Sequence, residues 1–525
     1  MTYDSFEDFQ YDSCVSRGLC SINPRTSALQ GVLLLYLKLS AKYMLKLYKE
    51  NLIDESAKQL ILNTIAITVS NPEFTESSFV STVVNFKKEL PKIIETYNEK
   101  YGTNDFEEES LLASELFRDS EDIIEAIRYG ERTFRKAVES VPAQIRDLYQ
   151  IMLVIAKSLS INLLDLESFE KNYTDAFITI LTLLDSINTE ERDTQKLINS
   201  IYDAAKVDNQ LMRLLRDAQE ERYGKQTAND VSYTTTPSKA ALVVGSNIRE
   251  LETVLEALKD EEIDVYTHDD MMLAHTFPKF SQYEKLKGQY GQGLENCLLD
   301  FATFPGPIII RKHSLHNIEN FYRGRLFTTD TTCPTGVITI TDNNFSEVIK
   351  SAHEAKGFKT GKQCETVTIG YNFEEKINEI KSKLDSGKYS EVFMIGLERY
   401  SLEQKAYFEK LFKLAPEKVL IISFSYNLER ENLIHINTCF DSYSLIRIFD
   451  NIKDYTYPIT VFIPKCDKNT ISEMVYLSGN PNTSVYVGKC TPIILNPSLM
   501  NTLKSVFSIN GITSAKKDIE TIVSN

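Results

Sequence analysis

Several features are missing from this sequence of 525 residues. Its longest apolar runs, such as residues 32–36 and 307–310, are interrupted by Lys or by turn residues long before a bilayer could be crossed, so we expect no transmembrane helix. The first residues are acidic, whereas a secretory signal needs a basic start and an apolar centre. We therefore expect a cytoplasmic protein with no membrane partner.

The common signatures of cofactor and metal sites are also absent. There is no Gly-Lys-Ser/Thr phosphate loop, no His-Glu-x-x-His and no Cys-x-x-Cys. The turn after the apolar run 240–244 has one glycine, Gly245, where a dinucleotide-binding loop needs several. The 8 cysteines are too dispersed for a disulfide scaffold, so we interpret them as thiols.

The charge balance restricts the partners. With 74 acidic and 58 basic residues the formal net charge is -16, which repels phosphate backbones and anionic lipid, so we expect no nucleic-acid partner. A hydrophobic share of 42% and a charged share of 25% are typical of globular proteins.

Residues 1–223 read as a helical bundle domain. Asn23 is suited to the N-cap and Pro24 to the first helical position, and apolar residues then recur at helical spacing. Similar amphipathic stretches follow as far as Tyr223, which predicts a bundle. The polar segment 224–238 ends in Thr-Thr-Thr-Pro-Ser and is interpreted as a protease-sensitive linker.

The remaining sequence alternates strands and helices. Residues 240–244 and 264–266 read as strands that flank a helix, and after a Gly- and Lys-rich loop at 356–363 the alternation continues from a strand at 366–371. This pattern predicts two α/β domains with parallel, Rossmann-like sheets, at 239–363 and 364–525. The expected fold class is therefore α plus α/β, multidomain.

Two groups of residues could carry chemistry near the start and middle of the chain. Cys14 and Cys20 lie in one loop and could supply two ligands to an iron–sulfur cluster, but not the four it needs, which favours two structural thiols. A cluster of His268, Asp269, Asp270 and His275 follows a strand and could bind one metal ion or move a proton, unless the carboxylates here simply cap a helix.

Two further thiols follow strands of the last domain. Cys439 and Cys466 are both expected at the carboxyl rim of the sheet. They could be packed in the core or, if within disulfide reach, act as a redox pair.

Several stretches together resemble the hybrid-cluster (prismane) protein family, which is known for hydroxylamine reductase activity and is related to carbon monoxide dehydrogenase. The resemblance runs over nearly the whole chain and implies a helical first domain and two α/β domains. It is carried by residues 14–30, 265–275 (Val-Tyr-Thr-His-Asp-Asp-Met-Met-Leu-Ala-His), 287–291, 304–310 (Phe-Pro-Gly-Pro-Ile-Ile-Ile), 325–329 and 439–444 (Cys-Phe-Asp-Ser-Tyr-Ser).

The departures from the family's pattern begin with its N-terminal cubane loop. That loop has four cysteines, of which Cys14 and Cys20 match the last two, whereas Thr2 and Ser5 stand at the first two positions. Neither replacement is a thiolate, so the resemblance implies a vestigial cubane site.

Most ligands of the hybrid cluster are also replaced. The resemblance places Ser246 at a histidine ligand, Asp270 at a glutamate ligand and Ser314 at a cysteine ligand. A hydroxyl stays protonated at neutral pH and is a poor ligand for soft iron clusters.

The same holds in the last domain. Glu398 falls at the cysteine that carries the extra sulfur and Phe424 at the next one, whereas Cys439 is intact. The terminal glutamate aligns with Cys466, which a matching Lys468 follows. Losing most thiolates removes the free energy that would hold the metals.

We therefore expect a non-catalytic relative without a cofactor, in which side chains such as Phe424 refill the chamber of the cluster. Its role would be binding or structural, with an unknown protein partner or a second copy of the chain. The alternative is a hydroxylamine reductase-like oxidoreductase with a reduced or altered iron–sulfur site, or with one metal ion. That metal would be held by a subset of His268, Asp270, His275, Cys439 and Cys466.

Overall fold

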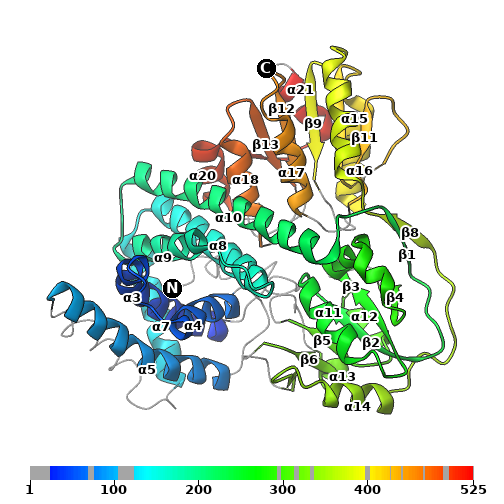
Figure 1. Cartoon of the computed structure of the whole chain (residues 1–525). Coiled ribbons are helices and arrows are strands. Elements are labelled where there is room, and N and C mark those ends of the chain that lie inside the picture. The colour runs from blue at the N-terminus through cyan, green and yellow to red at the C-terminus, as the bar shows by residue number, and fades with distance from the viewer. Residues whose placement is uncertain are drawn as a thin grey trace.

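The computed structural model describes residues 24–68, 76–103, 123–291, 297–311, 319–330, 336–396, 402–425, 427–438, 442–464, 468–488 and 496–523. Figure 1 shows a helical part in blue to teal, an α/β part in green and a second α/β part in yellow to red. The expected fold class, helices followed by two parallel-sheet α/β domains, is confirmed.

Helix α3 begins at Pro24, as the Asn-Pro pair predicts. Side chains cap two helices of the helical domain: Asp54 accepts a hydrogen bond from the amide of Ala57, and Asp193 accepts from the amides of Gln195 and Lys196. The described helices are α3 (Pro24–Lys49), α4 (Glu55–Ile67), α5 (Glu76–Tyr101), α7 (Ile123–Ser140), α8 (Ala143–Glu167), α9 (Thr174–Asn188) and α10 (Thr194–Tyr223).

Helix α8 lies at the centre of the molecule. Among the described residues it is the one helix long and apolar enough to cross a membrane, but 89% of its most apolar window is buried inside the protein. It packs against α9 and α10 on one side and against helices of the last domain on the other. Helix α8 is therefore apolar because other parts of the protein enclose it.

The first α/β domain has a six-stranded parallel sheet in the order β4-β3-β2-β5-β6-β7. Its elements are β2 (Lys239–Val244), α11 (Ile248–Ala257), β3 (Ile263–His268), η1 (Asp269–Thr276), η2 (Pro278–Gln282), β4 (Leu286–Gln289), α12 (Cys297–Thr303), β5 (Ile308–Ile310), α13 (Asn320–Arg323), β6 (Leu326–Thr328), β7 (Ile338–Thr339) and α14 (Ser346–Glu354).

The second α/β domain has another six-stranded parallel sheet, in the order β11-β10-β9-β12-β13-β14. Its elements are α15 (Phe373–Asp385), β9 (Glu391–Ile395), α16 (Leu402–Leu414), β10 (Val419–Ser423), β11 (Leu433–His435), α17 (Ser442–Ile452), β12 (Ile459–Ile463), α18 (Thr470–Ser478), β13 (Thr483–Val487), α20 (Pro497–Phe507), β14 (Ile509–Gly511) and α21 (Ala515–Val523).

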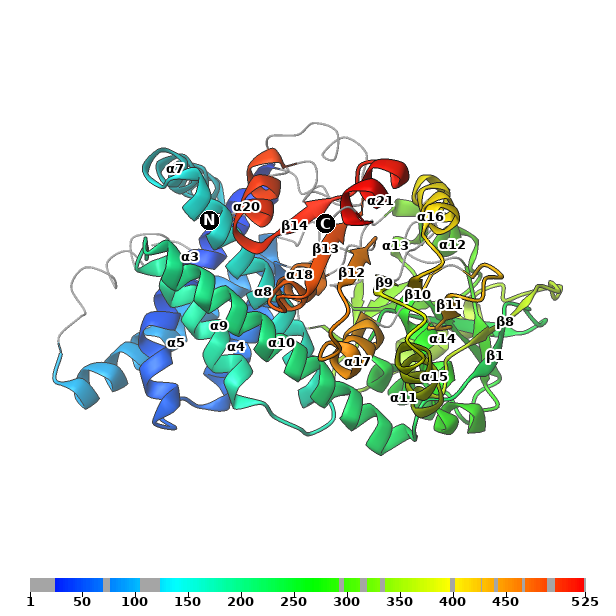
Figure 2. The same ribbon diagram turned by 90° about the horizontal axis from the view of Figure 1, so that it is seen from above.

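The strand expected at 366–371 does not join the second sheet. As β8 (Thr366–Ile369) it pairs antiparallel with β1 (Asn229–Ser232), a strand inside the segment expected to be a loose linker. Val231 and Ile369 are buried together with Met272, and this small apolar cluster explains the pairing. The two α/β domains are thus joined by a ribbon (Figure 2).

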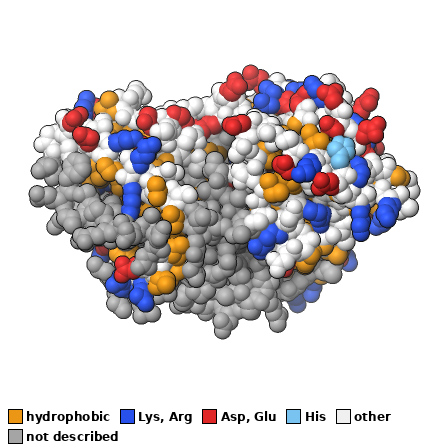
Figure 3. All heavy atoms as spheres, turned by 90° about the horizontal axis from the view of Figure 1, so that it is seen from below, with side chains coloured by type: hydrophobic (Ala, Val, Ile, Leu, Met, Phe, Trp, Pro, Cys, Tyr) orange, Lys and Arg blue, Asp and Glu red, His pale blue; other side chains and the backbone are white. Residues whose placement is uncertain are grey.

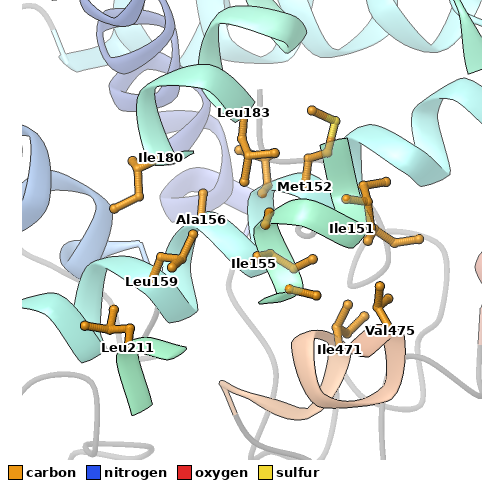
Figure 4. Packing of buried hydrophobic residues seen from close by; sticks show 14 of the residues in the cluster. Ile151, Met152, Ile155, Ala156, Leu159, Ile180, Leu183, Leu211, Ile471 and Val475 are labelled. Carbon is orange, nitrogen blue, oxygen red and sulfur yellow. The ribbon is translucent and has the colours of Figure 1, made fainter. Parts of the chain in front are cut away.

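One hydrophobic core serves both the helical domain and the second α/β domain. Figure 4 shows Ile151 and Ile155 of α8 facing Ile471 and Val475 of α18, and all four belong to one buried cluster. The two faces of the first sheet bury separate clusters, one with α11 and α14 and one with α12. The second α/β domain is therefore packed on the helical domain more intimately than the first is.

On the face shown in Figure 3, Asp and Glu side chains gather along the upper rim while Lys and Arg are interspersed among them.

Candidate functional site

Each sheet has one point where the strand order reverses, and the two points face the helical domain. In the first sheet the reversal lies between β2 and β5, and in the second between β9 and β12. Ligand crevices of open α/β sheets lie outside the carboxyl ends of the strands at such points. Ser246 directly follows the turn after β2, and Arg311 directly follows β5.

The side chains from these two crevices meet at Asp165, near the end of α8. The Asn247 amide donates to Asp165 Oδ1 at 2.9 Å, and the Arg311 guanidinium donates to the same atom at 3.3 Å. From the second α/β domain, Lys468 Nζ lies 3.7 Å from Asp165 Oδ2. Asp165 is 4% exposed, so one buried carboxylate contacts all three domains.

Two further carboxyl groups, those of Asp330 and Glu250, lie around Arg311. Its Nε donates to Asp330 Oδ1 at 3.3 Å, and Thr329 Oγ1 donates to Glu250 Oε1 at 2.7 Å. Burial alone would lower the pKa of Arg311, but the charges of Asp330, Asp165 and Glu250 outweigh it and raise the pKa. Arg311 therefore stays charged inside the junction.

Of the carboxyl groups around Arg311, that of Glu250 titrates near neutral pH. Burial raises its pKa to about 7 against the opposing charge of Arg311. Its Oε2 atom is buried without a hydrogen bond, whereas Oε1 has Thr329. A buried carboxylate oxygen without a hydrogen bond favours the protonated form.

A polar cluster continues deeper between the helical domain and α18. Asp208 of α10 accepts a hydrogen bond from Ser158 Oγ at 2.6 Å and from Asn162 Nδ2 at 3.0 Å. Both donors also contact Asn469 Oδ1, at 2.8 and 3.1 Å. Asp208 is completely buried.

The residues after β3 do not converge on one site. His268 Nε2 lies 3.0 Å from Asp300 Oδ2, whereas His275 Nε2 lies 2.8 Å from Thr267 Oγ1. Burial lowers the pKa of His275 to about 4, which leaves it neutral. Among the described residues no group of three or more His, Cys, Asp or Glu is arranged to hold a metal ion.

Asp269 and Asp270 stand in the first turn of η1. The N-cap of η1 is His268, and its side chain makes no capping hydrogen bond. Asp269 instead has a φ of 60°, a left-handed backbone that Asp tolerates better than most residues. Asp270 is half-buried.

Phe424 follows β10 and is 2% exposed. It belongs to the core shared by the helical and second α/β domains, together with Ile422 and Ile436. The expectation that Phe424 is buried in apolar surroundings is confirmed. Ser246, by contrast, is half-buried in its turn.

Eight of the ligand positions singled out from the sequence lie outside the described residues: Thr2, Ser5, Cys14, Cys20, Ser314, Glu398, Cys439 and Cys466. Sequence reasoning in turn missed Asp165, Arg311, Glu250 and Asp208. A usable signal was present for one of them, because Ser158, Asn162 and Asp165 are polar residues at helical spacing within an apolar stretch.

The sequence model that describes the Prismane/CO dehydrogenase family matches residues 10–520 of this chain. The hydroxylamine reductase of Acidiphilium cryptum is 25% identical, and the match covers 96% of this chain and 94% of the relative. That of Thermodesulfovibrio yellowstonii is 23% identical, with 97% and 98% covered. Among solved structures, carbon monoxide dehydrogenase IV from Carboxydothermus hydrogenoformans superposes with a TM-score of 0.48 at 12% identity, covering 100% of this chain and 95% of that one.

Proposed function

Because the chain belongs to the prismane/CO dehydrogenase family, we propose that it is a member that retains the fold, works without the hybrid cluster and has a binding or structural role. The resemblance inferred from the sequence motifs is confirmed at the level of the family. The loss of the cluster is the part that remains to be tested.

The donor set does not fit the family's cluster. Of the positions that the resemblance assigns to ligands, Phe424 offers no donor atom and is enclosed by apolar side chains. Ser246 offers a hydroxyl, which stays protonated at neutral pH, and Asp270 has a shorter side chain than glutamate. We therefore derive no redox step for this chain.

The observation that carries the proposal is the ion-pair junction at Asp165. Cationic groups from both α/β domains, Arg311 and Lys468, lie 3.3 and 3.7 Å from its two oxygens. The three domains are thus held together by the protein's own charges at the crevices that face each other. This contact between the domains is made by the protein's own side chains.

Metal content and turnover test the proposal directly. We expect protein purified under anaerobic conditions, and then offered iron and sulfide, to contain less than one hybrid cluster per chain. It should not reduce hydroxylamine with a strong electron donor. The hydroxylamine reductase of Acidiphilium cryptum, reconstituted in parallel, is the positive control.

Two cysteine variants identify the source of any cluster that does form. Turnover that is lost in Cys439→Ser would establish the altered-cluster oxidoreductase instead. A cubane electron-resonance signal that disappears in the Cys14→Ser, Cys20→Ser double variant would show that two thiolates suffice for the N-terminal cluster.

The binding role has two possible partners, another protein or a second copy of this chain. Light scattering over a range of protein concentrations separates them, because self-association increases the measured mass with concentration. If the measured mass remains that of a single chain at every concentration, the partner is a different protein.

A further inference from the structure

The Ser158 hydroxyl lies close to more hydrogen-bond acceptors than it has protons to donate. The hydroxyl has a single proton, yet Oγ lies 2.6 Å from Asp208 Oδ2 and 2.8 Å from Asn469 Oδ1. The two protons of the Asn162 amide are directed at Asp208 Oδ1 and Asn469 Oδ1, at 3.0 and 3.1 Å. One short oxygen–oxygen contact is left without a proton if Asp208 is ionised.

Exchanging the oxygen and nitrogen positions of the Asn469 side-chain amide does not supply the missing proton. Its nitrogen would then face the Asn162 nitrogen at 3.1 Å, and two donors would oppose each other. A proton on Asp208 does supply it. Asp208 then donates to Ser158, which donates to Asn469, while Asn162 donates to Asp208 and Asn469.

Burial supports the neutral form of Asp208. The residue is 0% exposed, Ser158 is 0% exposed and Asn162 is 2% exposed. Burial raises the pKa of Asp208, and this outweighs the hydrogen bonds of Ser158, Ser472 and Asn162 and the charge of Lys468.

The other charged groups on the helices that pack against α10 are engaged elsewhere. Lys157 of α8 donates to the backbone oxygen of Thr68 at 3.0 Å, and Arg447 of α17 pairs with Glu220 at 2.9 Å. The carboxylate of Asp165 is shared by Arg311 and Lys468, as described above. Glu473, in the first turn of α18, is a second buried acid of this region.

Asn469 joins this network at the expense of a helix cap. It occupies the N-cap position of α18, where Asn usually accepts from a backbone amide, but its side chain makes no capping hydrogen bond. The side chain instead contacts Ser158 and Asn162 of α8. The start of α18 is therefore tied to the helical domain by this network.

We propose that Asp208 carries a proton in the folded protein and that this proton completes a latch, Asp208–Ser158–Asn469, between the helical domain and the second α/β domain. Removal of the proton leaves a buried charge and one repulsive oxygen–oxygen contact. The latch therefore loosens as the pH rises. The proposal does not depend on whether the chain binds metal.

The variant Asp208→Asn tests the latch, because an amide presents the same donor and acceptor as a protonated carboxyl group but cannot ionise. An acid whose folded pKa is raised loses stability as the pH rises from its unfolded pKa, about 3.9, through its folded pKa. We expect the Tm of Asp208→Asn, relative to the unaltered chain, to rise as the pH increases above the unfolded pKa of about 3.9. Hydrogen exchange of α18, corrected for the intrinsic rate, should accelerate with pH only in the unaltered chain.

The control is Asp518→Asn. Asp518 is 4% exposed and accepts from Tyr407 Oη at 2.7 Å and from the Thr513 amide at 2.9 Å, so its partners already act as donors. This variant should lose stability without any gain at alkaline pH. An Asp208→Asn protein that is less stable by the same amount at every pH, with α18 exchange that follows the intrinsic rate, would overturn the proposal. If that variant does not fold, the exchange of α18 in the unaltered chain decides alone.

Discussion

The ammonium group of Lys468 lies 3.7 Å from the carboxylate of Asp165. This pair joins the loop that precedes α18 to the end of α8, and the same carboxylate accepts from Arg311 of the first α/β domain. Glu398, a candidate site residue of the same domain as Lys468, lies outside the described residues. The observed partner comes from a domain more than 300 residues earlier in the chain.

Asp165→Asn should destabilise the protein by about 3 to 5 kcal/mol, because removing one partner of a buried ion pair leaves the cations without full compensation. The matched control is Asp203→Asn on α10, whose carboxylate is 73% exposed and pairs with Lys206 at 3.1 Å. The control should change stability by less than about 1 kcal/mol. Urea unfolding measures both, and equal effects would show that the Asp165 junction adds little.

Phe424→Ala should lower stability by about 3 to 5 kcal/mol, because the side chain is buried in the shared core and its loss leaves a cavity. Phe321 of α13, which is 61% exposed, supplies the control. Phe321→Ala should be close to neutral in the same thermal or urea titration. A small effect at Phe424 would mean that the space around it is filled by solvent rather than by protein.

Glu252 should make the protein sensitive to acid. Its side chain is 4% exposed and accepts from Arg222 Nε at 2.7 Å, Lys279 Nζ at 2.6 Å and Tyr223 Oη at 2.9 Å. Burial would raise its pKa, but these hydrogen bonds lower it to about 2. A depressed pKa stabilises the fold above the unfolded value of about 4.3, and this stabilisation is lost as the pH falls toward about 2.

The measurement is the urea midpoint between about pH 5 and about pH 2. Glu252→Gln should make the urea midpoint depend less steeply on pH over this window. Glu221→Gln, at a carboxylate that is 69% exposed, should leave this pH dependence unchanged. An unchanged pH dependence in Glu252→Gln would assign the acid sensitivity to other carboxylates.

Gly306→Ala should destabilise by about 1 to 3 kcal/mol or more, because a Cβ at this position would overlap the backbone oxygen of Ala240 in β2. Gly324 offers the control, since a Cβ there meets open space. Thermal unfolding should therefore separate the two variants. If Gly306→Ala unfolds like Gly324→Ala, then β2 and the strand that follows Gly306 are less closely packed than described.

The helices and most strands could be predicted from local pattern. The Asn23-Pro24 start, the amphipathic stretches and the strand–helix alternation are short-range signals, and they led to the correct fold class. The strand at β8 was assigned to the wrong sheet because its partner, β1, lies some 130 residues earlier and carries no pairing signal of its own. Apolar strand residues reveal that a strand exists, but not which edge it joins.

The candidate site was harder to predict than the fold. The resemblance directed attention to Ser246, Asp270 and Phe424, but the charged junction is built from Asp165, Arg311 and residues near them. Contacts such as Asn247 to Asp165 or Ser158 to Asn469 span 82 and 311 residues, and no local spacing encodes them. The polar residues Ser158, Asn162 and Asp165, at helical spacing within an apolar stretch of α8, were the one available clue.

The core shared by the helical domain and the second α/β domain has a consequence for biosynthesis. The ribosome completes α10 at Tyr223, but residues such as Leu477 and Ile509, which complete the same core, are made last. At about 5 to 20 residues per second, the nascent helices wait on the order of 15 to 60 s for these residues. During that interval the first α/β domain, which has cores of its own, can fold, while the apolar face of α8 stays open to chaperones or to misassembly.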